Sequence, residues 1–405
     1  MLFYLFFLVS VILFGSTNIG PISLRVLATT AMMAYLLFTP RKMVVLGKNT
    51  YIVIYAIYIV VYGVALMFNG EFFEYGFIKQ VLAYFLVAII AYYATIIFLK
   101  NERDIKLVYI VFISILVLTS VVTILQFTDQ PIGWQIGLLF NEYKDGMEEK
   151  IYNYGLIQDN LLGASYAVGI FGHPVKNAMF IASIAILPLI NITENKSLIK
   201  RLVYVVIFAT SLIACFMTQQ RSAFYILMLS AILISLYISK NKLFIITLGA
   251  FLIMVLWPTI SELMLSENLG RLSWSNLHVD ESRDVLWSNA IYFIEENLMW
   301  GGPMSFMRLN QGLPAHNFFL SAFIYGGLIG GLVIIFLFFK ICKDAISITL
   351  ANRQKKNYAF IFSISLIVFL IQGMFHNGTL IDGESLIFIF LAISITANKI
   401  QERTR

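Results

Sequence analysis

Three side chains that could hold and activate an anionic substrate lie beside apolar runs of this chain. Arg221 occupies the short polar turn 218–222, Arg283 opens the amphipathic stretch 282–294, and His316 directly precedes another apolar run. The planar guanidinium of arginine can bind a phosphate through two parallel hydrogen bonds, and a neutral imidazole can accept the proton of a hydroxyl group. These residue types therefore favour chemistry on a phosphorylated substrate.

Four further residues are candidates for binding the same substrate: Lys79, Lys176, Asn317 and His376. His376 follows an apolar run at a place comparable to that of His316, so it competes with His316 for the role of a base.

Arg221 and Lys79 also have a structural explanation, as does Arg25 at the start of another apolar run. Long cationic side chains near the end of a membrane helix can extend their charge toward the lipid headgroups. We expect this anchoring role for Lys79 and Arg25, whereas for Arg221 both interpretations stay open.

The other candidates have structural explanations of a different kind. Arg283 could form an ion pair with Asp280 or Glu281, and His316 could cap or pack the helix that follows it. In the stretch 172–177, we expect Pro174 to be the first residue of a helix, where proline is favoured.

The elements that must position these residues are membrane helices. The 405 residues are 60% hydrophobic and 12% charged, against roughly 45–50% and 25% in a soluble domain. Too little polar surface remains to cover a water-soluble globule, so the composition predicts an all-α, polytopic membrane protein. Apolar runs between polar breaks predict twelve spans, near 1–15, 21–38, 51–68, 80–99, 107–127, 174–191, 202–218, 222–239, 243–258, 317–339, 357–374 and 385–398.

The distribution of charge predicts the orientation of these spans. With a cytoplasmic N-terminus, six short segments on that side hold 19 of the 28 lysines and arginines. Cytoplasmic segments of membrane proteins are enriched in both residues, so we expect both termini in the cytoplasm and the candidate site outside. A nucleic-acid partner is not expected, because the basic residues are spread over six loops rather than gathered on one face.

Two segments on the predicted outer side are longer than connectors need to be, namely 128–173 and 259–316. Both are predicted to belong to one membrane-embedded domain, 1–405. The stretch 282–294 within the second segment is expected to be a helix at the outer membrane interface. Four glycines in the next span, Gly326, Gly327, Gly330 and Gly331, have the spacing that lets a neighbouring helix approach closely.

Several classes of function are excluded or unsupported. The two cysteines and four histidines show no metal-site spacing, so we expect neither a metal nor a cofactor. The sequence contains no Walker motif, so this chain alone is not expected to be an ATP-driven pump. A glycoside hydrolase would need a pair of carboxylates, and the spacing of Asp159, Glu281 and Asp284 singles out no pair.

An ordered set of short motifs resembles the O-antigen polymerase and ligase family of bacterial surface polysaccharide assembly. The resemblance covers roughly residues 160–340. The motifs are Gly172-His173-Pro174 with Asn177; Gln220-Arg221-Ser222-Ala223; Ser282-Arg283 with Leu286-Trp287; Gly301-Gly302; and His316-Asn317-Phe318-Phe319-Leu320 followed by Gly326-Gly327-Leu328-Ile329-Gly330.

The resemblance implies a metal-independent, inverting glycosyltransferase of the GT-C type that acts on undecaprenyl-diphosphate-linked glycans outside the bacterial plasma membrane. It implies that Arg221 and Arg283 hold the donor's diphosphate and that His316 acts on the acceptor hydroxyl. Two departures are Gln220, where many relatives carry Ser or Thr, and the modest length of the segment 259–316.

The leading hypothesis is a polysaccharide polymerase that transfers a growing glycan from undecaprenyl diphosphate to a lipid-linked repeat unit, for an O-antigen, capsule or exopolysaccharide. Expected partners are lipid-linked repeat units and membrane lipid, with a chain-length regulator and a flippase. One alternative is a ligase that transfers finished glycan to a lipid A core or another acceptor. An alternative of another class is a flippase or transporter of lipid-linked glycan.

Overall fold

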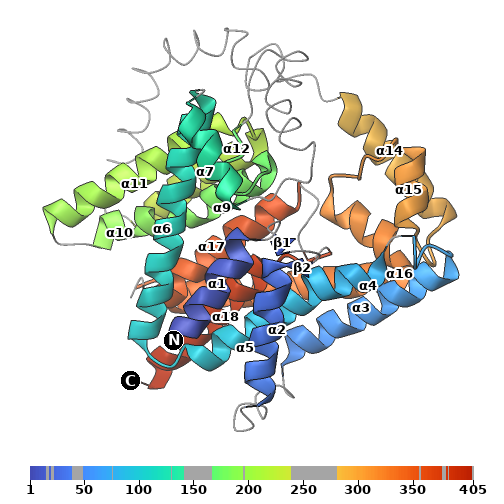
Figure 1. Cartoon of the computed structure of the whole chain (residues 1–405), viewed down its shortest axis with the longest axis horizontal. Helices are drawn as coiled ribbons and strands as arrows, with labels where there is room; N and C mark the ends of the chain where they lie inside the picture. Colours follow the sequence, from blue (N-terminus) through green and yellow to red (C-terminus); the bar gives the residue numbers. More distant parts are fainter. Residues whose placement is uncertain are drawn as a thin grey trace. The chain divides into compact units, whose positions relative to one another are not determined.

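The chain folds into two compact units, each described here by itself (Figure 1). The first unit comprises Met1–Val108, Glu281–Asn352 and Asn357–Arg405, and the second comprises Tyr109–Asp280 and Arg353–Lys356. The computed structural model describes residues 1–14, 18–19, 22–38, 49–74, 76–128, 130–140, 167–194, 197–238, 281–354, 357–375, 380–381 and 383–403, of which residues 18, 19, 22, 238 and 281–283 are described by their backbone alone.

The described residues are almost entirely helical. The helices of the first unit are α1 (Leu2–Leu13), α2 (Leu24–Leu37), α3 (Thr50–Phe68), α4 (Phe77–Gln80), the π-helix η2 (Val81–Phe85), α5 (Leu86–Phe98), α14 (Glu281–Glu296), α15 (Pro303–Leu309), α16 (Phe318–Ala351), α17 (Tyr358–Gly373) and α18 (Ser385–Arg403). Helix α6 (Glu102–Phe127) begins in the first unit and continues into the second, which also contains α7 (Pro131–Phe140), α9 (Pro174–Ile184), α10 (Ile186–Glu194), α11 (Leu198–Met217) and α12 (Arg221–Ile238). The strands β1 (Asn18–Ile19) and β2 (Ile22–Ser23) form one antiparallel pair.

Seven of the described helical segments are long and apolar enough to cross a membrane. They are Thr50–Phe68, Phe77–Phe98, Glu102–Phe127, Pro174–Glu194, Leu198–Met217, Phe318–Ala351 and Ser385–Arg403. Shorter apolar helices coincide with four more of the predicted spans, at Leu2–Leu13, Leu24–Leu37, Arg221–Tyr237 and Tyr358–Gly373. The protein is therefore an all-α, polytopic membrane protein. The predicted span 243–258 lies outside the described residues.

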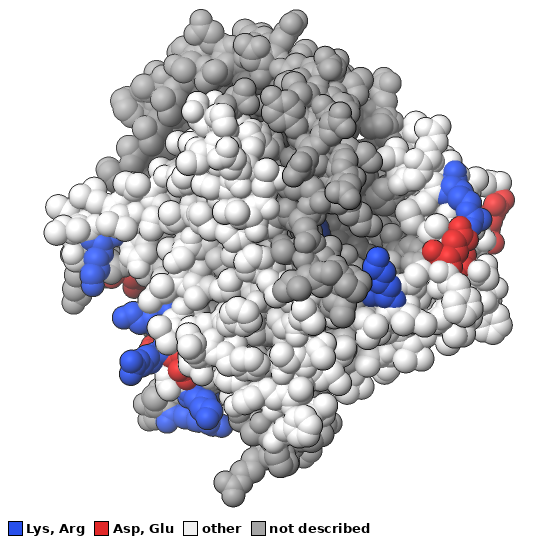
Figure 2. All heavy atoms as spheres, in the orientation of Figure 1, with Lys and Arg blue, Asp and Glu red and all other residues white. Residues whose placement is uncertain are grey.

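The surface of the described part agrees with a membrane environment. Figure 2 shows that most of the visible described surface carries neither acidic nor basic side chains. Many large apolar side chains point outward, and on α11 they include Leu202, Val203 and Val206. Such side chains face hydrocarbon in a membrane, where apolar exposure has no cost.

A column of tyrosines on α3 forms much of the core of the first unit. Tyr55, Tyr58 and Tyr62 are fully buried, and their rings pack around Phe85 of η2 with centroid distances of 5.8–6.4 Å. Helix α16 packs along α3, because Gly330 leaves room for the side chains of that helix. Helix α18 packs against both α5 and α17.

Helix α16 is interrupted at Gly327, whose φ of 59° and ψ of −162° are not helical. Its 34 residues would be about 51 Å long as one rod, which exceeds the roughly 30 Å hydrocarbon core. The backbone of residues 298–302 fills the interruption: Gly302 N–H donates to Ile324 O over 2.8 Å, and Leu328 N–H donates to Leu298 O over 2.7 Å. The break therefore leaves these backbone groups satisfied.

Two glycines of α16, Gly327 and Gly330, pack against different kinds of neighbour. A Cβ atom on Gly330 would meet Val61 of α3 at 3.4 Å, which is the helix contact that the glycine spacing predicts. A Cβ atom on Gly327 would lie 2.3 Å from Met299 O, and one on Gly301 would lie 2.4 Å from Ile324 O. At Gly327 the close neighbour is therefore loop backbone, which the sequence did not predict.

In the second unit, a buried polar network fixes the chain before α9 against α6. The Asn177 amide accepts from Thr119 Oγ1 over 2.7 Å and donates to Thr123 Oγ1 over 2.8 Å. The Gln126 amide accepts from Val168 N–H and Gly169 N–H and donates to Gly169 O. These bonds set the position at which α9 begins.

Candidate functional site

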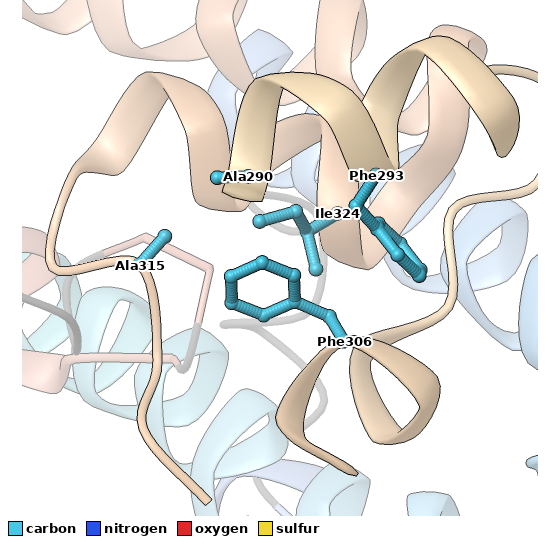
Figure 3. Packing of buried hydrophobic residues seen from close by; sticks show 5 residues of the cluster. All are labelled: Ala290, Phe293, Phe306, Ala315 and Ile324. Carbon is cyan, nitrogen blue, oxygen red and sulfur yellow. The ribbon is translucent and has the colours of Figure 1, made fainter. Parts of the chain in front are cut away.

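Helix α14 is held in place by a small apolar cluster in the first unit. Figure 3 shows Ala290 and Phe293 of α14 packed with Phe306 of α15, Ile324 of α16 and Ala315, which precedes α16. The rings of Phe293 and Phe306 meet edge to face at 5.5 Å. The predicted helix 282–294 is thus confirmed as α14, with bounds that differ by one or two residues. Its position at a membrane interface stays a prediction.

Two hydrogen bonds tie α14 to the segment that leads to His316. The indole N–H of Trp287 donates to Ala315 O over 3.0 Å, and the Asn289 amide donates to Asn310 Oδ1 over 2.8 Å. Arg283 precedes Trp287 by one helical turn, so the two positions share a face of α14. The backbone therefore places Arg283 one helical turn from Trp287, which donates to Ala315, the residue before His316.

His316 adopts a left-handed backbone conformation, with φ of 49°, and is half-buried. The next residue caps α16, because Asn317 Oδ1 accepts from Phe319 N–H and Leu320 N–H over 2.9 and 3.2 Å. Capping of α16 is thus the role of Asn317 rather than of His316. A role for Asn317 in substrate binding stays a prediction.

The segment 298–309 is anchored to the end of α3 by residues that the sequence did not single out. Glu71 is 3% exposed, and its carboxylate accepts from Met304 N–H, Ser305 N–H and Ser305 Oγ over 2.6–3.0 Å. These donors lie in the first turn of α15, where a negative charge is favourable. The Asn69 amide donates to Trp300 O over 3.0 Å, and the Trp300 ring stacks on Phe68 at 4.1 Å.

An exposed ion pair adds to this anchor. Arg308 of α15 donates to both carboxylate oxygens of Glu74, and this contact raises the pKa of Arg308 above its usual value. Exposed pairs of this kind contribute little to stability. The buried carboxylate of Glu71 is therefore the main link between α3 and α15.

Arg221 is the first residue of α12 and is half-buried. The turn before it is buried: Thr218, Gln219 and Gln220 are 0%, 1% and 8% exposed. Gln219 has a φ of 55°, and neither its side-chain oxygen nor its nitrogen has a hydrogen-bond partner in the described part of the chain. A buried amide without partners beside Arg221 is a polar position that a substrate group could fill.

Lys176 lies on α9, which packs against α12 within the second unit. His173 Nδ1 accepts from Val175 N–H over 3.2 Å and so caps α9, and Pro174 is the first residue of the helix, as predicted. Lys176 and His173 are both exposed. Asn177 is engaged by Thr119 and Thr123 and acts in the fold.

Two candidates near predicted span ends differ in exposure. Lys79 on α4 is exposed, which is consistent with an anchor. Arg25 on α2 is 8% exposed, so it is not the exposed side chain that the anchoring role leads one to expect.

The candidate residues are divided between the two units. Arg283, His316, Asn317 and Lys79 belong to the first unit, and the second contains Arg221 and Lys176. His376 lies outside the described residues; Met374 O, two residues before it, accepts from Phe318 N–H over 3.2 Å. The expected grouping of Arg221 with Arg283 and His316 stays a prediction.

Comparison with known proteins adds no family to this description. No model of a known protein family matches the chain, and no curated protein matches it. Within the described residues, no group of three or more His, Cys, Asp and Glu side chains could hold a metal ion.

Proposed function

We propose that the protein is a polysaccharide polymerase that transfers a growing glycan from undecaprenyl diphosphate to a lipid-linked repeat unit. One contact carries most of the support: the Trp287 indole bonds to the carbonyl directly before His316, one helical turn from the position of Arg283. The apolar cluster of Figure 3 packs α14 with Ala315, the residue before His316. A cation and a base on two firmly joined elements suit transfer from a diphosphate to a hydroxyl.

In this reaction the bond between the anomeric carbon and the diphosphate oxygen breaks, and the acceptor oxygen bonds to the same carbon from the opposite face. Arg283 and Arg221 balance the charge that develops on the departing diphosphate. His316 accepts the proton of the acceptor hydroxyl. The glycosidic bond forms with inversion, and the lipid diphosphate leaves.

The interruption of α16 does not favour a transporter. Broken helices in transporters leave backbone groups free to bind ions or substrate. Here Ile324 O and Leu328 N–H are occupied by Gly302 and Leu298. The break serves to join α16 to the segment that carries α14 and α15.

The test uses purified full-length protein and one defined lipid-linked repeat unit. We expect Arg283→Ala and His316→Ala each to lower polymer formation by about 100-fold or more, because a base and a charge-stabilising donor each typically contribute that much. Arg283→Lys should recover only part of the activity, since lysine keeps the charge but lacks the planar fork. Product length on a gel is the readout.

Arg308→Ala is the matched control, because it removes an exposed arginine from the same segment. It should polymerise as the native chain does. Full-length polymer from Arg283→Ala or His316→Ala would reject the roles of those residues. No polymer from the native chain, with attachment of finished glycan to a non-lipid-linked acceptor, would point to a ligase instead.

A further inference from the structure

Arg25 is a buried arginine in the first turn of α2 whose guanidinium has few partners. The residue is 8% exposed, and its Nη2 atom donates to the Ser385 hydroxyl over 3.5 Å. Its Nε atom has no hydrogen-bond partner among the described residues. The ion pairs within the described part, Arg308 with Glu74 and Lys340 with Asp344, do not include it, although the Glu384 carboxylate lies near enough to attract its charge.

Such an arrangement is unfavourable without further hydrogen-bond acceptors. A guanidinium carries five N–H donors and stays charged, and a buried charge is retained in proteins where it is paired. One long hydrogen bond to a neutral hydroxyl does not replace the water that Arg25 has lost. Because Glu384 attracts the charge but accepts no hydrogen bond from Arg25, the position has N–H donors left for a group with several acceptor oxygens.

The surroundings of Arg25 are built from three firmly packed elements of the first unit. The ring of Tyr84, in the π-helix η2, lies with its centroid 5.4 Å from the Arg25 Cζ atom. Gly383, with φ of 74°, packs so tightly on η2 that a Cβ atom there would be 2.8 Å from the Tyr84 carbonyl carbon. This packing places Ser385, the first residue of α18, beside the guanidinium. Single π-helical turns are rare and occur frequently at functional sites.

The same elements present apolar side chains to the outside. Leu27 on α2 and Leu82 and Tyr84 on η2 are 39%, 51% and 41% exposed, and α2 packs against η2. In a membrane these side chains lie against acyl chains. The charge distribution predicts that this end of α2 is near the outer headgroups, where phosphate is the abundant anion.

We propose that Arg25, Tyr84 and Ser385 form a binding site for the phosphate group of a membrane lipid. The guanidinium donates to two phosphate oxygens, the Ser385 hydroxyl donates to a third acceptor position, and the lipid's chain lies along Leu27 and Leu82. The residues of this site differ from the arginines assigned to the donor's diphosphate. It stands whether or not the chain is a glycosyltransferase.

The experiment measures ligand-induced stabilisation of the full-length protein in detergent. The probes are phosphatidylglycerol, a polyprenyl diphosphate and inorganic pyrophosphate, with diacylglycerol as the phosphate-free control. We expect the phosphate-bearing lipids to raise the unfolding temperature of the native chain, and the shift to vanish in Arg25→Met. Arg25→Lys should weaken binding by about tenfold, because it loses the paired hydrogen bonds.

Two comparisons make the result specific. Without ligand, Arg25→Met should unfold at a higher temperature than the native chain, since it replaces a buried charge with unsatisfied N–H donors by an apolar side chain. Arg308→Ala, which removes an exposed cation from the same unit, should keep the full lipid response. A stronger response to polyprenyl diphosphate than to phosphatidylglycerol would identify a substrate lipid as the occupant, and equal responses would identify bulk anionic lipid.

The proposal fails if Arg25→Met retains the native shift with phosphate-bearing lipids, or if diacylglycerol gives the same shift as phosphatidylglycerol. If Arg25→Met does not fold, native mass spectrometry of Arg25→Lys carries the test, and undiminished retention of lipid there overturns the proposal. Binding is measured directly, so a negative result here leaves the polymerase assay untouched.

Discussion

Individual buried polar residues of this protein differ in whether the fold supplies their partners. The Gln126 amide makes four hydrogen bonds, to Gly133, Val168 and both backbone groups of Gly169. The Gln219 amide, 1% exposed, makes none in the described part. A satisfied buried amide stabilises its unit, whereas an unsatisfied one costs free energy unless a ligand completes it. We therefore expect Gln219 to contribute to the candidate site beside Arg221.

This difference predicts opposite effects for one substitution at two positions of the second unit. Gln126→Met should lower the free energy of unfolding by roughly 1–3 kcal/mol, because it leaves the backbone groups around Gly169 unpaired. Gln219→Met should leave stability unchanged or raise it, and should lower transferase activity. Thermal unfolding in detergent measures the stability of each variant, and the polymerase assay measures its activity. A loss of stability at Gln219 equal to that at Gln126 would show that the fold itself needs this amide.

Residue roles were predictable where they depend on near neighbours in the chain. Pro174 at the first position of α9 is confirmed, because the preference is local. The burial of Arg25 and the role of Glu71 were missed, because their partners Ser385 and Ser305 are 360 and 234 positions away. No spacing within either segment signals such a contact.

At the scale of helices, the apolar runs located eleven of the twelve predicted spans as helices in the described residues. Helix α14 also follows its sequence pattern. The short helix α15, the π-helical turn η2 and the break in α16 were not predicted. All three depend on contacts between distant segments, such as the insertion of residues 298–302 beside Gly327.

The break predicts that neighbouring glycines of α16 tolerate a methyl group very differently. Gly327→Ala should destabilise the first unit by roughly 2–4 kcal/mol, because it combines a strained φ with a backbone clash. Gly330→Ala is the matched control: its Cβ atom would make an ordinary contact with Val61 at 3.4 Å. Unfolding temperatures of the two variants provide the comparison. Equal stability of both would show that the break is not required.

At the scale of the whole chain, the distribution of charge predicts the orientation in the membrane. Phe73, between α3 and α4, is predicted outside, and Asn101, between α5 and α6, is predicted in the cytoplasm; both are exposed. The segment Phe77–Phe98, which lies between them in the chain, is long and apolar enough to cross a membrane. The side on which each end lies is predicted from the distribution of lysine and arginine.

Labelling of whole cells with a membrane-impermeant maleimide tests this orientation. We expect Phe73→Cys to react and Asn101→Cys to react only after the membrane is opened. The native thiols give little background, because Cys215 is buried and Cys342 is half-buried and predicted inside. Reaction of Asn101→Cys in intact cells would invert the topology and move the candidate site to the cytoplasmic side.

The hydrogen bonds that the Glu71 carboxylate accepts have a consequence for the synthesis of the protein. Its carboxylate is completed by Ser305, a residue synthesised 234 positions later. At bacterial and eukaryotic elongation speeds of about 5–20 residues per second, the ribosome needs roughly 12–47 s to supply that partner. During this interval the Glu71 carboxylate, just after α3, lacks the hydrogen-bond donors that α15 later supplies. We expect quality-control proteases to degrade chains truncated before residue 303 faster than chains truncated after α15.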